Sequence, residues 1–126
     1  MSNQIPELLA RWATKRPNEC RFTTTPNGDY YQMGDYKFWF SHGELCTEHS
    51  SNWNSFSGQP ALDWLRGVVE RAIEAAGIDY EYRFIAQIGI SIPKHKVIIF
   101  NAKRGVIRDE KTVALLTAYV EWMEAQ

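Results

Sequence analysis

The 126-residue chain has the length of one ordinary domain, and its 44% hydrophobic and 23% charged residues form a globular composition that excludes a disordered chain. A net charge of −1 provides no global field that would attract nucleic acid or an anionic membrane surface. We therefore expect a single domain over residues 1–126, folded around one hydrophobic core.

Two cysteines, Cys20 and Cys46, bear on the cellular compartment. A domain with an adequate apolar core has little need of a disulfide, so we expect reduced thiols. The start of the chain contains no apolar run of signal-peptide length, and no stretch reaches the roughly 18 apolar residues of a membrane span. The sequence therefore predicts a soluble, cytoplasmic protein without membrane contact.

The first half of the chain predicts a helix followed by a meander of strands. Apolar residues at helical spacing indicate a helix over about residues 3–15, which Pro17 ends. Short aromatic and β-branched runs follow between residues 21 and 48. They are separated by the turn pairs Asn27-Gly28, Gly34-Asp35 and His42-Gly43. We expect three or four antiparallel strands here, and a surface loop over residues 49–58.

The second half predicts a helix, a long hairpin and a last helix. The amphipathic helix covers about residues 60–76, with Gly77 as its left-handed stop. Alternating apolar residues predict a strand over residues 80–92, a turn at 93–95 and a returning strand at 97–100. A basic connector over residues 101–108 leads to Asp109, the expected N-cap of the last helix.

The apolar stripe of the last helix is unusually wide. It comprises Val113, Leu115, Leu116, Tyr119, Val120, Trp122 and Met123. A stripe of that width predicts a helix that is covered on two sides. The complete succession is α-β(3-4)-α-β-β-α, which indicates an α+β fold with an antiparallel sheet covered by helices on one face.

This succession resembles the class I chaperones of type III secretion systems, which are small cytosolic homodimers that hold the unfolded segment of an effector. The segment Leu115-Leu116-Thr117-Ala118-Tyr119-Val120-Glu121-Trp122 is also similar to the closing helix of that family. The resemblance implies a chaperone-like protein that binds another protein and forms a homodimer.

Metal-ligand and acid–base residue types gather in one stretch, which contains His42, Glu44, Cys46, Glu48 and His49. A small enzyme or a metal-binding protein is therefore the alternative function, with His42, Cys46 and His49 as the metal candidates. On a strand, however, residues 42, 44, 46 and 48 point to one side and residue 49 to the other. Hydrolase, P-loop and dinucleotide signatures are absent, so we assign no catalytic residue and expect no cofactor.

A second alternative is an RNA-binding domain. Basic residues cluster near the predicted hairpin, at Lys94, His95, Lys96, Lys103, Arg104, Arg108 and Lys111. The helix, three strands and second helix also have the element order of a double-stranded-RNA-binding domain, a family with lysines at the start of its second helix. Residues 59–63 contain no lysine at the matching positions, which disfavours nucleic acid.

The chain is rich in aromatic residues, with five Trp, six Tyr and six Phe. Some fall outside the obviously inward faces, namely Tyr31, Trp39, Trp53, Phe56 and Trp122. Aromatic rings are enriched at protein interfaces, although an aromatic-rich sheet could also use them in its core. The sequence thus favours a protein-binding domain of chaperone, adaptor or inhibitor type that covers a partner's surface without catalysis.

Overall fold

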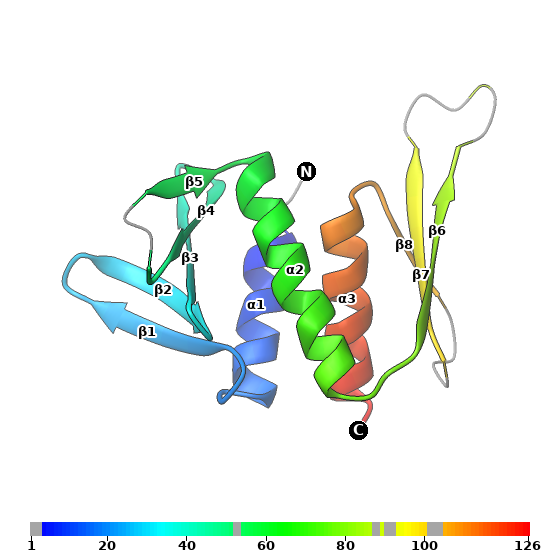
Figure 1. Cartoon of the computed structure of the whole chain (residues 1–126), viewed down its shortest axis with the longest axis horizontal. Coiled ribbons are helices and arrows are strands. Elements are labelled where there is room, and N and C mark those ends of the chain that lie inside the picture. The colour runs from blue at the N-terminus through cyan, green and yellow to red at the C-terminus, as the bar shows by residue number, and fades with distance from the viewer. Residues whose placement is uncertain (1–3, 52–53, 87–88, 90–92, 101–104) are drawn as a thin grey trace.

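The computed structural model describes residues 4–51, 54–86, 89, 93–100 and 105–126, and it places three helices between two antiparallel sheets (Figure 1). The helices are α1 Gln4–Lys15, α2 Gln59–Ala75 and α3 Lys111–Glu124. The first sheet has the strand order β1 Arg21–Thr25, β2 Gly28–Met33, β3 Tyr36–Ser41, β4 Glu44–His49 and β5 Ser55–Ser57. The second has the order β6 Tyr80–Ile85, β7 Lys94–Ile99 and β8 Val106–Arg108. The predicted α+β class is confirmed.

The strands divide between two sheets, whereas the sequence suggested one sheet covered on one face. Helices α1 and α2 pack on the five-stranded sheet, and α3 packs on β7 and β8 (Figure 1). Buried residues from all three helices and both sheets form one hydrophobic cluster. The chain is therefore one small domain in which a layer of helices separates two sheets.

Helix α3 is the central element of this arrangement. Every residue from Thr112 to Val120 is buried, and Leu115, Leu116 and Tyr119 have no exposed surface. A helix that is apolar all round must be enclosed, and α3 contacts α1, α2, β7 and β8. The prediction of a helix covered on two sides is confirmed, and this helix joins the two halves of the fold.

The end of α2 follows the predicted stop signal. Helix α2 ends at Ala75, and Gly77 has a φ of 69°. The backbone N–H of Ile78 donates to the carbonyl of Ile73 over 3.2 Å, which is the long hydrogen bond of a Schellman motif. The chain then turns toward β6 on the far side of the helical layer.

Two short strands were not predicted. Residues 55–57, within the expected loop 49–58, pair with β4 as β5, and residues 106–108, within the expected connector, pair with β7 as β8. Each has three residues, which is too short to show a period of two along the sequence. The strand expected over residues 80–92 ends at Ile85, and most of its remainder lies outside the described residues.

The N-cap of α3 is Glu110, so the prediction of Asp109 is wrong by one residue. The backbone N–H of Val113 donates to Oε1 of Glu110 over 3.0 Å, while Asp109 forms an ion pair with Lys94. We expect Glu110→Ala to lower the free energy of unfolding by about 1 kcal/mol, because it leaves a helix N–H without its acceptor. Urea denaturation measures this change. Asp109→Ala is the matched control, and an effect of Asp109→Ala as large as that of Glu110→Ala would contradict the assignment.

Candidate partner-binding surface

Of the aromatic residues predicted to bind a partner, those that the structure describes do not lie on one surface. Tyr31 and Phe56 lie on the helix-facing side of the five-stranded sheet, in register with Phe38 and Thr47. Trp39 lies on the opposite face, paired with Cys46. These positions follow from the alternation of side chains along paired strands.

Trp122 and Trp53 complete that set. Trp122 lies near the end of α3, where its ring stacks on Tyr119 at 6.0 Å and the Arg16 guanidinium lies 5.3 Å from it. Trp53 lies outside the described residues. The described members of the set are therefore spread over separate parts of the molecule, and Tyr31, Phe56 and Trp122 contact other rings of the chain.

The histidine and cysteine cluster also separates. His42 lies in the turn before β4 with a φ of 52°, whereas His49 lies at the other end of β4, opposite Tyr36. Cys46 is on the outer face of the sheet and His49 on the helix-facing side, as the alternation predicted. In the part of the chain that the structure describes, no group of three His, Cys, Asp or Glu side chains could hold a metal ion.

His49 has the closest approach to a catalytic arrangement. Its Nδ1 lies 2.6 Å from the hydroxyl of Ser51 and 3.1 Å from the Ser51 backbone nitrogen. Its Nε2 lies 4.0 Å from a carboxylate oxygen of Asp35, which is too long for a hydrogen bond. The imidazole is therefore hydrogen-bonded to Ser51 in the turn that follows β4. The Asp35 carboxylate does not orient it as a carboxylate orients the histidine of a general base.

Both cysteines are free and buried. Burial and the charge of Glu19 raise the pKa of the Cys20 thiol to about 12. Burial and Glu44 raise the pKa of Cys46 as well. Reactive cysteines need a lowered pKa, so these thiols have the character of small apolar side chains.

Most of the large hydrophobic side chains that are exposed in the described part of the chain lie in or directly after the three-stranded sheet of β6, β7 and β8. Among the described residues, four large hydrophobic side chains are exposed, and three of them belong to this sheet or follow it directly: Phe84 at 56%, Phe100 at 57% and Ile107 at 47%. Helix α3 packs under β7 and β8, while β6 and β7 extend past the start of that helix (Figure 1). Phe84 and Ile107 lie on opposite faces of this sheet, since Phe84 is in register with His95 and Ile107 with Lys96. They therefore do not form one patch, and Phe84 is the one that lies on β6.

The aromatic side chains at the projecting end of this sheet are held in place by neighbours. The hydroxyl of Tyr82 lies 2.6 Å from Nδ1 of His95, and the ring of Phe84 lies 5.4 Å from that of His95. The ammonium of Lys111 lies 4.2 Å from the centre of the Tyr82 ring. Preorganised rings lose little conformational entropy when a partner covers them.

Some of the charges on this sheet are paired. Glu81 and Arg83 form an ion pair along β6, and Lys94 pairs with Asp109, whose pKa it lowers. Paired charges provide little of the positive field that phosphate backbones require. The distribution offers no continuous basic stripe across the described part of the sheet.

Strand β6 forms an edge of this sheet and pairs only with β7 in the described part of the chain. The N–H of Phe100 donates to the carbonyl of Asp79 over 3.0 Å, which places the odd-numbered residues of this segment in hydrogen-bonded pairs with β7. Along an antiparallel strand, the backbone groups of successive residues point alternately toward the partner strand and away from it. The N–H and C=O groups of Tyr80, Tyr82 and Phe84 therefore face away from β7. Among the described residues these groups have no backbone partner, and such a row is a template for another strand.

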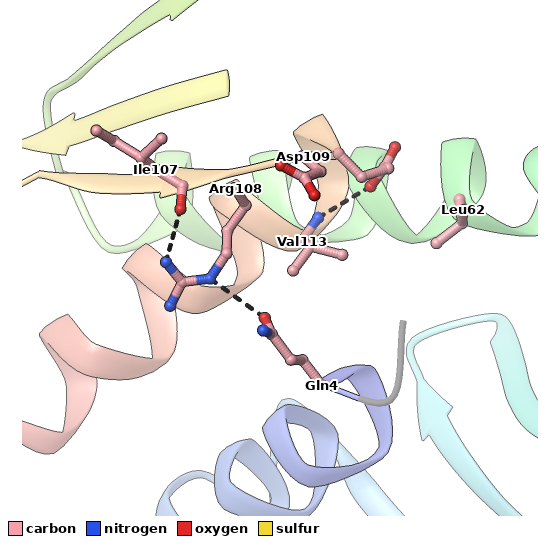
Figure 2. Close-up of a pocket in the computed structure, with 7 residues that line it drawn as sticks. Gln4, Leu62, Ile107, Arg108, Asp109 and Val113 are labelled. Atoms are coloured by element: carbon pink, nitrogen blue, oxygen red, sulfur yellow. Dashed lines mark hydrogen bonds between the residues drawn. The ribbon is translucent and has the colours of Figure 1, made fainter. Parts of the chain in front are cut away.

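A pocket of about 330 Å³ lies beside β8, at the end of the molecule where the three helices begin (Figures 1 and 2). Its lining comprises Gln4, Leu62, Ile107, Arg108, Asp109, Glu110 and Val113. Figure 2 shows Arg108 held across the pocket, where it donates to Oε1 of Gln4 over 3.2 Å and to the carbonyl of Ile107 over 2.7 Å. The pocket therefore combines polar side chains that are hydrogen-bonded within the chain with the apolar side chains of Leu62, Ile107 and Val113.

The sequence did not single out Glu81, Arg83 or Phe84. Its alternation over residues 80–92 grouped Tyr80, Tyr82 and Phe84 on one face, but only the strand order shows that β6 is an edge.

No described helix combines the length and the apolar character that a membrane crossing requires. Comparison with protein-family models, curated proteins and solved structures found no match to this chain.

Proposed function

We propose that this chain is a protein-binding domain that takes up a strand of its partner along the free edge of β6. The observation that carries the proposal is the row of unpaired backbone groups on β6 beside the Phe84 ring, which is 56% exposed. In this mode of recognition, backbone hydrogen bonds supply affinity, and side chains next to the edge select the partner. A chaperone, an adaptor and an inhibitor could each act in this way, without catalysis.

The surroundings of β6 support this mode. The ring cluster of Tyr82, Phe84 and His95 lies next to the edge, and the Glu81–Arg83 ion pair lies on the other face of the same strand. An added strand would therefore meet aromatic side chains on one face and charged ones on the other. Such a two-faced strand can select its partner's sequence and register.

A photo-crosslinking experiment in the source cell tests the proposal. A photoreactive phenylalanine analogue replaces Phe84 in one variant and Phe22, which is 50% exposed on the other sheet, in the control. We expect discrete protein adducts from position 84 and a much lower yield from position 22. Tyr82→Pro in the first variant should abolish the adducts, because it removes an outward backbone N–H and, with the ring, the side-chain hydrogen bond to His95, while the backbone hydrogen bonds to β7 are kept.

Two outcomes would contradict the proposal. One is a failure of position 84 to form any protein adduct. The other is an equal set of adducts from positions 84 and 22, which would indicate nonspecific apolar contact. Hydrogen exchange of the β7 amides confirms that the Tyr82→Pro chain keeps its sheet.

A further inference from the structure

We propose that the strand taken up by β6 is the β6 strand of a second copy, related by a two-fold axis that lies midway between the two Tyr82 residues. This inference rests on the proposed function, because it names the occupant of the same edge. Two copies paired in this way would form one six-stranded antiparallel sheet across the dimer.

The geometry of antiparallel pairing limits the registers to be considered. Directly opposite residues in an antiparallel pair share a face of the sheet. A two-fold axis between two β6 strands must therefore lie midway between one residue and the same residue of the second copy. The central candidates in β6 are Glu81, Tyr82 and Arg83. An axis at Tyr82 makes the outward-facing backbone groups of Tyr80, Tyr82 and Phe84 meet their equivalents, which gives about six new backbone hydrogen bonds.

Charge selects one of these three registers. With the axis at Tyr82, Glu81 of each copy lies directly opposite Arg83 of the other. With the axis at Glu81, the two glutamates face each other, and with the axis at Arg83, the two arginines do. Like charges placed directly opposite each other destabilise strand pairing, whereas opposite charges stabilise it. The Glu81–Arg83 ion pair within each strand would become a ring of four alternating charges.

The other face of β6 is self-complementary in the same register. Tyr80 of one copy lies opposite Phe84 of the other, so a half-buried ring covers the ring that is 56% exposed in the isolated chain. Aromatic pairs across neighbouring strands are favourable. In this dimer, the exposed ring of Phe84 is therefore covered by Tyr80 of the second copy.

The helices leave room for the second copy. Helix α3 packs under β7 and β8 and not mainly under β6, so β6 overhangs the helical layer. Strands in a sheet lie about 4.8 Å apart. In the joined sheet, the two β6 strands would lie between the β7 and β8 strands of one copy and those of the other, so the two α3 helices would be kept apart. The space under the joined β6 strands is where the Tyr80, Tyr82 and Phe84 rings of both copies meet.

Sedimentation equilibrium with exchanged charges tests this dimer. The unmodified chain should be a dimer, and Glu81→Arg or Arg83→Glu alone should weaken it by about tenfold or more. An equimolar mixture of the two single variants should form heterodimers, because each position 81 then meets an opposite charge at position 83. The double variant E81R/R83E should form homodimers again. Arg21→Glu, on the edge strand of the other sheet, is the control and should leave the dimer intact.

Recovery of the dimer in the mixture also shows that both single variants are folded. Single variants that remain dimeric would overturn the inference, since the copies would then associate through another surface. An unmodified chain that stays monomeric while Phe84 crosslinks to a different protein would also overturn it, but the proposed function would stand. A monomeric chain without any crosslink from position 84 would contradict both the dimer and the proposed function.

Discussion

Replacing Leu116 with alanine is expected to lower the free energy of unfolding by about 2–5 kcal/mol. Leu116 has no exposed surface and lies in the part of α3 that is buried all round. Truncation there removes apolar contacts and leaves a cavity that helices α1 and α2 and the three-stranded sheet cannot all move to fill. A loss of this size is a large fraction of the stability of an ordinary domain, which is about 5–15 kcal/mol.

Urea denaturation of Leu116→Ala beside Ile107→Ala measures the effect. Ile107 is 47% exposed, so its truncation should change the free energy of unfolding far less than that of Leu116. Similar losses for the two variants would contradict the central position of α3. A Leu115→Ala variant extends the test, because neighbouring residues point to different sides of a helix and both are fully buried here.

The second large effect is expected from Glu19, which connects α1 to α3. One carboxylate oxygen of Glu19 accepts a hydrogen bond from the Trp12 indole over 3.0 Å and another from the Tyr119 hydroxyl over 2.7 Å. Arg16 lies 3.2 Å from the other oxygen. Trp12 and Tyr119 are almost completely buried, and burial together with Glu19 raises the pKa of Tyr119.

Glu19→Ala should lower the free energy of unfolding by about 2–4 kcal/mol, because it leaves two buried donors without an acceptor. Glu19→Gln should cost less, since the amide oxygen can still accept. A double-mutant cycle with Tyr119→Phe measures the coupling directly, and the two changes should not be additive. Additive effects would show that the hydrogen bond between Glu19 and Tyr119 contributes little.

Glu124→Ala is the matched control for Glu19. Glu124 also links α3 to α1, through Arg11 at 2.9 Å and 2.5 Å, and this ion pair lowers the pKa of Glu124. Its side chain is partly exposed to solvent, and exposed ion pairs contribute at most about 1 kcal/mol. The same chemical change should therefore have a clearly smaller effect at position 124 than at position 19.

Local sequence signals predicted the longer elements well. The apolar period of α2 and its Gly77 stop, and the turn pairs between β1 and β4, depend on residues a few positions apart. The three-residue strands β5 and β8 exist because β4 and β7 offer them hydrogen-bond partners, which no local pattern reveals. The division into two sheets is also nonlocal, although the wide apolar stripe of α3 indicated an enclosed helix.

The candidate site was less predictable than the fold. Residue type alone groups Trp39 with Tyr31, yet they lie on opposite faces of one sheet. The importance of Phe84 depends on β6 being an edge strand, which is a property of the complete strand order. The positions of Cys46 and His49 on opposite faces of the sheet, in contrast, follow from the alternation of side chains along a single strand, and they were predicted.

Residue-resolved hydrogen exchange of the β6 amides tests the account most directly. The N–H groups of Glu81 and Arg83 face β7 and should be protected at every protein concentration. Those of Tyr80, Tyr82 and Phe84 should be protected when the edge is occupied and should exchange fast after dilution or in Glu81→Arg. Fast exchange of these three amides at every concentration and with every partner would contradict the claim that β6 is a binding edge.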